Sequence, residues 1–453
     1  VYLQRLAARV VGEGLAGQVL VMRSSGGLMA VAEAARLAAA ILLSGPAGGV
    51  VAAAALGESL GHRRLVSFDM GGTSTDVCRI EDGRPEVAYE RAVDGYPCRL
   101  PSVAVHTVGA GGGSVGWRDA GGSLRVGPRS AGAEPGPACY GRGGSEPTVT
   151  DADLVLGRLD PKGRLAGAVP LDLEAARSAL APLGGALGLD IGEAALGMGS
   201  VVEARMERAV RAVSVEEGAD PRQAVLAAFG GAGGLHATAL ARRLEMSGVV
   251  IPPYAGVFSA VGMLLSPPRA DAARSVLVGA GESDRLGPAV EEVRHEAAGG
   301  LRDQTGSHPA GLRSVADVRY VGQAHETPVD HSPGEGWEAL GERFHAAHRE
   351  RNGFARPGDP IEVVTVRAEA VGTPALRWQD LPEHRPSGEP RRGARSVLTS
   401  GGEVRATVWW RPGLAPGREI RGPAVIEEGE ATTWLGRGEA AVVHPSGALE
   451  VRW

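Results

Sequence analysis

The chain has 453 residues with a formal net charge of −6, and 43% of its residues are hydrophobic, which is enough material for two or three globular domains. It carries no block of basic residues suited to nucleic acid and no apolar run of the ~20 residues that a membrane span needs. Three widely separated cysteines, Cys78, Cys98 and Cys139, make neither a disulfide framework nor a CxxC metal site. We therefore expect a cytoplasmic protein that binds neither nucleic acid nor a membrane.

The first distinctive element is a β-hairpin predicted between residues 65 and 80, with a turn rich in glycine and hydroxyl side chains. Its sequence reads Phe68-Asp69-Met70-Gly71-Gly72-Thr73-Ser74-Thr75-Asp76-Val77, and Asp82-Gly83 predicts a second turn before the next strand. Successive N–H groups in a glycine turn can form a nest for anions, to which the hydroxyl groups add donors. Asp69 and Asp76 are candidate ligands for a divalent cation. The pattern indicates a nucleotide-phosphate site, and a plain glycine-rich turn is the alternative.

Other common phosphate motifs do not fit the sequence. Lys162 is the only lysine, which excludes a loop of the GxxxxGK[ST] kind. A dinucleotide-binding fingerprint is also a poor match, because its glycines open a helix and the glycines after Asp69 open a strand.

Two further glycine clusters follow at predicted strand ends. Thr107-Val108-Gly109-Ala110-Gly111-Gly112-Gly113-Ser114 comes directly after His106, and a second hairpin is predicted to turn at residues 119–122. Farther on, a buried-strand run over 224–229 leads through Gly230-Gly231-Ala232-Gly233-Gly234 into a helix predicted over 235–244. Such a junction suits a nucleoside or phosphate at the helix N-terminus, although it is also a common packing device.

The remaining elements predict the domain organisation. Apolar residues recur at helical spacing from Met198 to Val213, which predicts a helix whose methionines fill the core. We expect one domain over residues 1–268, the start of a second α/β domain over 269–371, a linker or long loop over 372–400, and a β-rich C-terminal segment over 401–453.

Taken in order, these segments resemble the hydantoinase A / 5-oxoprolinase family, which includes the ATP-binding subunits of acetone and acetophenone carboxylases. The resemblance extends over most of the chain and includes residues 42–50, 68–77, 107–114, 130–141, 146–152, 228–233, 252–259, 319–323 and 422–428. It implies an α/β fold with an actin-like ATPase (ribonuclease H-like) core and a β-rich C-terminal domain. Family members open with another glycine–threonine hairpin that this sequence lacks, so the first half-domain is expected to be absent or supplied by another chain.

The resemblance also implies roles for the motif residues. Asp69 and Asp76 would order Mg²⁺, and His106 joins them as a catalytic candidate that could bind metal or substrate or move protons. Residues of the first two glycine loops would bind phosphate oxygens, and residues of the third would lie beside the adenosine of ATP. These phosphate- and nucleotide-binding candidates are Gly71, Gly72, Thr73, Ser74, Thr75, Gly111, Gly112, Gly113, Gly230, Gly231 and Gly233.

By resemblance, the activity is ATP-dependent hydrolysis of a cyclic amide, such as a hydantoin or 5-oxoproline, through phosphorylation of the amide carbonyl. The chain would be the A-type subunit of a heteromer with a B-type hydantoinase/oxoprolinase subunit. One alternative is the ATP-binding subunit of an acetone- or acetophenone-type carboxylase. A second is a non-catalytic nucleotide-binding partner, since one fold serves several functions.

Three more residues are weaker candidates. Asp151 is either a polar group of the cleft or a helix N-cap before Leu154. Cys139 has no histidine near it in sequence, which disfavours a nucleophile. His236, in the first turn of its predicted helix, is expected to be a surface or packing residue. The sequence also differs from the family pattern at Ser25, where asparagine is usual, and at Gly234, where proline is usual.

Overall fold

The structure is a computed structural model that describes residues 2–14, 18–88, 91–93, 95–98, 100–165, 167 and 169–453. The chain divides into two compact units, and each is assembled from separate stretches of sequence. The smaller unit comprises Val1–Arg23, Gly27–Ile41 and Ser266–Ala375. The larger unit comprises Ser24–Gly26, Leu42–Leu265 and Leu376–Trp453.

The smaller unit is built on an antiparallel sheet with the strand order β17-β20-β18-β19. Its strands are β17 (Arg269–Gly279), β18 (Gly311–Tyr320), β19 (Thr327–Asp330) and β20 (Ile361–Val371), and its long helices are α9 (Leu286–Thr305) and α10 (Trp337–Asn352). Buried and half-buried positions largely alternate along β20, as expected for a sheet with one covered face. The N-terminal part of the unit contains α1 (Tyr2–Gly12), β1 (Leu20–Met22), β2 (Leu28–Ala30), α2 (Val31–Arg36) and η1 (Ala38–Ile41), and η6 (Ala280–Arg285) precedes α9.

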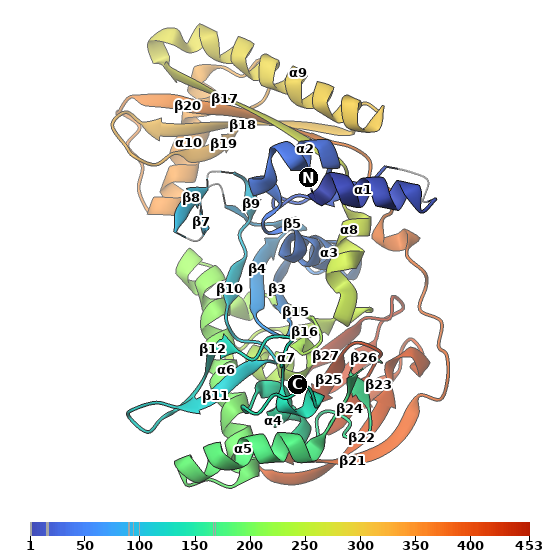
Figure 1. The fold of residues 1–453 in the computed structure, drawn as a ribbon. Helices are drawn as coiled ribbons and strands as arrows, with labels where there is room; N and C mark the ends of the chain where they lie inside the picture. Colours follow the sequence, from blue (N-terminus) through green and yellow to red (C-terminus); the bar gives the residue numbers. More distant parts are fainter. Residues whose placement is uncertain are drawn as a thin grey trace. The chain divides into compact units, whose positions relative to one another are not determined.

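The larger unit contains a nine-stranded sheet with the order β10-β4-β3-β15-β16-β27-β26-β23, in which β5 pairs with β4 (Figure 1). Its strands are β3 (Arg64–Met70), β4 (Thr75–Glu81), β5 (Arg84–Pro85), β10 (His106–Val108), β15 (Val225–Phe229), β16 (Gly248–Ile251), β23 (Glu419–Arg421), β26 (Ala440–Val443) and β27 (Leu449–Arg452). The predicted Asp69 hairpin is confirmed as β3 and β4, and the turn predicted at Asp82-Gly83 joins β4 to β5.

The first five strands of this sheet define its class. Counted along the chain, β3, β4, β10, β15 and β16 lie in the spatial order 3-2-1-4-5. β15 and β16 run parallel to β3, whereas β4 runs antiparallel to both β3 and β10. This order with a reversed second strand is that of a ribonuclease H-like sheet, the core of actin-like ATPases, and it confirms the expected α/β fold class.

Helices cover both faces of this sheet. Gly57 and Gly49 of α3 (Ser44–Leu60) lie so close to Leu65 and Phe229 that a Cβ atom would clash, which explains why α3 is rich in small residues. Leu65 and Asp69 share one face because alternate strand residues point the same way. Thr75 lies on the other face, where its hydroxyl contacts Met206 of α6 (Ile191–Val213). Figure 1 shows α3 and α6 on either side of β3 and β4.

The C-terminal region is β-rich, as expected, and it completes the larger unit. Its second sheet has the order β21-β22-β24-β25, with strands β21 (Arg391–Thr399), β22 (Gly402–Trp410), β24 (Ala424–Glu427) and β25 (Thr432–Leu435). The last strand, β27, pairs with β16 and so extends the central sheet. The buried Arg411 fixes this junction, because its Nη2 donates to the carbonyl oxygens of Ile251 at 2.8 Å and Gly447 at 3.0 Å.

The other elements of the larger unit are helices and two-stranded sheets. The α-helices are α4 (Val149–Val155), α5 (Leu173–Leu187), α7 (Gly233–Arg243) and α8 (Phe258–Leu265), and the short helices are η2 (Ala138–Tyr140), η3 (Val215–Glu217), η4 (Pro221–Gln223), η5 (Ala255–Val257), η7 (Trp378–Asp380) and η8 (Arg411–Gly413). The small sheets pair β6 (Val87–Ala88) with β9 (Ser102–Val103), β7 (Arg91–Val93) with β8 (Tyr96–Cys98), β11 (Ser114–Arg118) with β12 (Leu124–Ser130), and β13 (Arg164–Leu165) with β14 (Val169–Pro170).

No single helix in the described parts of the chain is long and apolar enough to cross a membrane. One helix pair, Leu173–Leu187 with Ile191–Glu217, bent by 86°, has the length and composition of a span, which is weak evidence because core helices of soluble proteins pass the same test.

Candidate functional site

The Asp69 hairpin ends in an exposed turn that leaves backbone donors available. The N–H group of Gly71 donates to the carbonyl oxygen of Ser74 at 3.1 Å, which closes the turn. Gly72 and Thr73 at its tip are exposed, and within the described residues their N–H groups form no hydrogen bond with the protein. Two adjacent, unengaged N–H groups are what an anion-binding turn requires.

Two carboxylates face each other beside this turn. Asp69 and Asp76 are directly opposite in the β3–β4 ladder. Ser259 of α8 donates from its Oγ to Asp69 Oδ2 at 3.4 Å, and Thr107 of β10 donates from its Oγ1 to Asp76 Oδ1 at 2.5 Å. Burial and the Asp76 carboxylate raise the pKa of Asp69 to about 6, against the opposing effect of the Ser259 hydroxyl. A divalent cation placed between the two acids would relieve their repulsion.

The donor set fits Mg²⁺ held jointly with phosphate. Within the described residues, no three His, Cys, Asp or Glu side chains converge on one position that could hold a metal alone. Mg²⁺ is commonly bound through only one or two carboxylates, with waters and substrate phosphates completing its octahedron. Asp69 and Asp76, which are opposite each other on one face of the sheet, supply the two carboxylates that such a site needs.

The second glycine loop, residues 109–114, is hydrogen-bonded to the turn of the Asp69 hairpin. The N–H groups of Gly112 and Gly113 donate to the carbonyl oxygens of Gly71 at 3.0 Å and Gly72 at 2.6 Å, and that of Gly111 donates to Ser114 Oγ at 2.9 Å. Side chains are excluded here, because a Cβ on Gly111 would lie 2.8 Å from the Gly71 carbonyl oxygen. The structure therefore brings the first two loops together, with the N–H groups of the second directed at the first.

The third glycine loop lies against the same hairpin. Ala232 donates its N–H to the carbonyl oxygen of Met70 at 3.1 Å, and Gly230 donates to Ala255 at 2.9 Å. Gly230 has a positive φ of 80°, and a Cβ there would collide with the Met70 carbonyl and with Asp69 Oδ1. Glycine is thus required both for conformation and for close approach. All three loops meet at the carboxyl ends of β3 and β15.

His106 lies on β10 but does not point toward the acid pair. It is opposite Val77, whereas the next residue, Thr107, is opposite Asp76. Because successive strand residues face opposite sides, the exposed imidazole of His106 is on the other face of the sheet from Asp69 and Asp76. Sequence reasoning missed Thr107 as the hydroxyl partner of Asp76. The only signal was its place at the start of the glycine loop.

Asp151 and Cys139 form a buried structural group. Thr148 is the N-cap of α4, and Asp151, three residues later, completes a capping box with it. The Asp151 carboxylate also accepts the N–H of Cys139 at 2.8 Å. Burial, followed by the nearby Asp151 carboxylate, raises the pKa of the Cys139 thiol far above its usual range. A thiol that stays protonated is a poor nucleophile, as expected for this cysteine.

Of the two expectations for His236, the structure contradicts a surface position, because its side chain is fully buried between two acids. Its Nδ1 lies 3.2 Å from Glu203 Oε1, and its Nε2 lies 3.3 Å from Asp153 Oδ2. No local pattern could have found this arrangement, because the three residues lie on three helices that are far apart in sequence.

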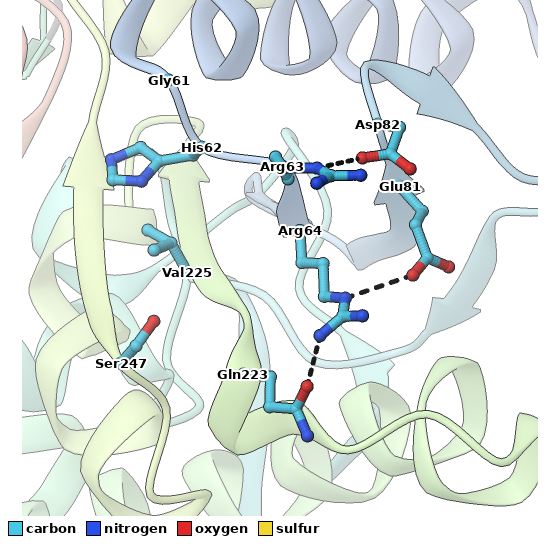
Figure 2. A pocket seen from close by; sticks show the side chains of 9 residues that line it. All are labelled: Gly61, His62, Arg63, Arg64, Glu81, Asp82, Gln223, Val225 and Ser247. Carbon is cyan, nitrogen blue, oxygen red and sulfur yellow. Dashed lines mark hydrogen bonds and ion pairs between the residues drawn. The ribbon is translucent and has the colours of Figure 1, made fainter.

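A separate pocket of about 350 Å³ lies at the opposite, amino end of the parallel strands (Figure 2). Its lining residues are Gly61, His62, Arg63, Arg64, Glu81, Asp82, Gln223, Val225 and Ser247. Figure 2 shows Arg63 bonded to Asp82 and Arg64 bonded to both Glu81 and Gln223. The arginines that line it are thus already engaged by protein groups, and the pocket is distant from the three glycine loops.

The fold and the geometry of the glycine loops together define the structural class of the larger unit. The larger unit is a ribonuclease H-like α/β domain whose glycine loops converge on an acid-bearing hairpin at the carboxyl ends of the strands. Comparison with known proteins gives the family. Residues 1–272 match the family model described as hydantoinase/oxoprolinase, and residues 310–446 match the model of the hydantoinase/oxoprolinase C-terminal domain. The chain therefore belongs to the hydantoinase/oxoprolinase family.

Relatives within the family include ATP-dependent enzymes. The chain is 32% identical to caprolactamase subunit alpha of Pseudomonas jessenii, over 99% of this chain and 67% of that protein. It is 32% identical to 5-oxoprolinase 1 of Arabidopsis thaliana, over 96% of this chain and 36% of that protein. The chain thus spans about two thirds of the first relative and about one third of the second.

Two solved structures share the fold over 99% of this chain. The crystal structure of the ATP-dependent caprolactamase from Pseudomonas jessenii matches with a TM-score of 0.85 and 31% identity, covering 67% of that chain. The nucleotide-free structure of acetone carboxylase, an enzyme of ATP-dependent acetone carboxylation, matches with a TM-score of 0.81 and 25% identity, and the match covers 66% of that chain.

Proposed function

We propose that the protein catalyses ATP-dependent hydrolysis of a cyclic amide of the hydantoin, 5-oxoproline or lactam type, in the cytoplasm, as the A-type subunit of an enzyme with a B-type partner. The observation that carries this proposal is the facing pair Asp69 and Asp76 beside an exposed turn with unengaged N–H groups. The ATP-dependent caprolactamase supports it, since that relative is similar along almost the whole of this chain.

The chemistry explains why ATP would be needed. An unstrained amide carbonyl is a poor electrophile, and transfer of the γ-phosphoryl group to its oxygen creates an imidate-like phosphate with a good leaving group. Water then attacks the ring carbon, and the C–N bond breaks with its electron pair and a proton going to nitrogen, which leaves an acyl phosphate. A second water hydrolyses the acyl phosphate to the carboxylate and inorganic phosphate. A bound Mg²⁺ would neutralise charge on the phosphates.

The residues of this chain would then bind and position. Asp69 and Asp76 would hold Mg²⁺ or its waters, and the N–H groups of Gly72 and Thr73 would bind phosphate oxygens. The loop from Gly230 to Gly233, at the N-terminus of α7, would lie beside the rest of the nucleotide. Catalysis of this kind rests on positioning and electrostatics rather than on a protein nucleophile. His106 is on the other face of the sheet, so the proposal gives it no part in phosphate binding.

A second candidate is the ATP-binding subunit of a ketone carboxylase. The similarity to the acetone carboxylase structure favours it, because that match also covers nearly the whole chain. In that reaction the phosphorylated species would be an enolate or bicarbonate instead of an amide. The same acid pair and loops would serve either reaction.

One set of assays separates these functions. The complete enzyme, purified with its co-purifying subunits, is incubated with 5-oxoproline, hydantoin or caprolactam, with and without ATP, and with acetone or acetophenone plus bicarbonate. We expect ring opening with one ADP released per ring. Equal ring opening without ATP would refute the mechanism, and bicarbonate-dependent loss of the ketone would establish the carboxylase instead. Asp69→Asn should lower the activity roughly 10²- to 10³-fold, whereas Asp82→Asn, at the other turn reached by β4, should leave it unchanged.

A further inference from the structure

The buried His236 lies at the centre of an ionic cluster. The Asp153 carboxylate contacts His236 through Oδ2 at 3.3 Å and Arg158 through Oδ1 at 3.1 Å. In the same way, the Glu203 carboxylate contacts His236 through Oε1 at 3.2 Å and Arg243 through Oε2 at 3.5 Å. Each carboxylate therefore bridges the imidazole and one arginine. Glu207 adds a further acid, 3.3 Å from Arg243, but does not contact the ring.

This geometry favours the imidazolium form. A neutral imidazole has one N–H group and one lone pair, so one ring nitrogen would direct a lone pair at a buried carboxylate oxygen. Protonation at both nitrogens turns both contacts into attractions. Burial lowers the pKa of His236, but the Asp153 and Glu203 carboxylates more than offset it, and the pKa is raised to about 9. Burial raises the pKa of Asp153, but His236 and Arg158 more than offset this effect and hold the pKa below its usual value.

The cluster joins three helices, and each helix contacts a different glycine loop. α4 carries Asp153, and its Thr150 donates from both N and Oγ1 to the carbonyl oxygen of Gly112, at 2.7 and 2.9 Å. α6 carries Glu203, and its Met206 Sδ lies 3.5 Å from the hydroxyl of Thr75 in the Asp69 hairpin. α7 carries His236 three residues after Gly233, at the end of the third loop.

We propose that His236 is a positioning residue, a buried cation that clamps α4, α6 and α7 together and thereby fixes the three glycine loops relative to one another. This inference rests on the proposed nucleotide site for its functional meaning. Separating the three helices would leave buried charges without their partners, which is costly, so the cluster resists such a displacement. Deprotonation of the ring would loosen all three loops at once, so nucleotide binding should weaken as the pH rises above about 9.

The informative variant is Glu203→Gln. The glutamine keeps the shape of the side chain and an oxygen to accept the Nδ1–H, but it removes one of the charges that hold the proton on the ring. Glu207→Gln is the matched control, because Glu207 lies on the next turn of α6 and shares Arg243 without contacting His236. A change shared by both variants would reflect only altered helix charge.

Three measurements test the inference in the complete enzyme. The first is the NMR titration of the His236 ring, the second is amide hydrogen exchange of peptides covering residues 107–114 and 228–234, and the third is the dissociation constant of a non-hydrolysable Mg·ATP analogue from pH 7 to 10. We expect the wild-type ring to lose its proton near pH 9. In Glu203→Gln the ring should titrate about one pH unit lower. At pH 8.5 its protonated fraction would then fall from about three quarters to about one quarter, so both loop exchange and the dissociation constant should rise roughly threefold.

The outcomes separate this inference from the proposed function. A His236 ring that titrates near 6.5, or loops that exchange equally in all three proteins, would overturn the positioning role even if nucleotide binds well. Failure of the wild type to bind the analogue at any pH would refute the nucleotide site, while ring titration and loop exchange still decide the clamp. If Glu203→Gln does not fold, the wild type alone tests the positioning role across the same pH series. Exchange in the loop peptides should then increase near pH 9 relative to peptides of β17 and β20, and an equal change in both would overturn the role.

Discussion

The two ends of the β3–β4 hairpin carry opposite kinds of charge pair. At one end Arg64 faces Glu81, and at the other Asp69 faces Asp76, in the same ladder. Opposite charges across a strand pair stabilise a sheet, and like charges destabilise it. The Arg64–Glu81 pair is about half exposed, with an N–O distance of 3.2 Å, so it contributes little. The acid pair lies at the end where the glycine loops converge. The charge pair at the Arg64 end therefore favours the fold, whereas the pair at the Asp69 end opposes it, which is typical of a functional site.

The strongest test of this contrast is removal of one member of the acid pair. Asp69→Asn should reduce ATP-dependent activity of the complete enzyme roughly 10²- to 10³-fold, as expected when a preorganised charge is lost from a phosphate site. In the absence of nucleotide, the variant should unfold with a free energy about 1 kcal/mol higher than that of the wild type, because a half-buried like-charge contact is gone. Steady-state assays and urea unfolding measure the two quantities. Full activity in Asp69→Asn would show that the acid pair is not part of the functional site.

Two glycines with the same backbone conformation give the next largest effect. Gly230 at the loop end has φ +80°, and Gly61 at the pocket end has φ +74°. A Cβ at Gly61 meets nothing within 4 Å, whereas a Cβ at Gly230 collides with Met70 and Asp69. Gly61→Ala should cost about 1 kcal/mol of unfolding free energy from backbone strain alone, and Gly230→Ala about 3 kcal/mol with strain and overpacking combined. Denaturant unfolding of both variants checks this. Equal losses would mean that the loop end is no more tightly packed than the pocket end.

Local patterns predicted the loop end of the hairpin well. Residues 68–77 alternate and turn in a way that places Asp69 opposite Asp76, and glycine runs next to strand ends mark positions of close backbone approach. Such features depend on residues adjacent in sequence, so they can be read without knowing the fold. The helix from Met198 to Val213 was found for the same reason, and the structure extends it from Ile191.

Contacts between residues that are far apart in the sequence could not be predicted. The burial of His236 depends on Asp153 and Glu203, and the sequence gives no sign that α4, α6 and α7 meet there. The pairing of β27 with β16, which sets Val451 opposite Val249, is equally invisible because a short apolar strand fits many neighbours. Residues 391–399, within the segment expected to be a linker or long loop, form β21, since their polar composition reflects an exposed strand of the second sheet.

The buried His236, which lies close to the glycine loops, should make the stability of the protein depend on pH. The pKa of His236 is raised from 6.5 to about 9 in the folded protein. The folded state therefore holds this proton more tightly than the unfolded chain, so the stabilisation is complete below about pH 6.5 and is lost as the pH rises through about 9. We expect the free energy of unfolding to fall by roughly 2 kcal/mol between pH 7 and 10 from this group. An equal fall in Glu203→Gln and the wild type would assign the change to other groups.

The smallest effect is expected at the pocket end. Arg64→Ala removes the contacts to Glu81 and Gln223 that are drawn in Figure 2. Both side chains of the ion pair are about half exposed, so its removal should lower the unfolding free energy by no more than about 1 kcal/mol, and high salt should abolish the difference. The KM for ATP and kcat should not change, because Arg64 lies at the opposite end of β3 from Asp69. Unfolding at low and high salt, together with steady-state kinetics, tests both statements. A changed KM would show that a substitution at the Arg64 end of the hairpin affects the glycine loops. The two ends of the hairpin would then not be independent.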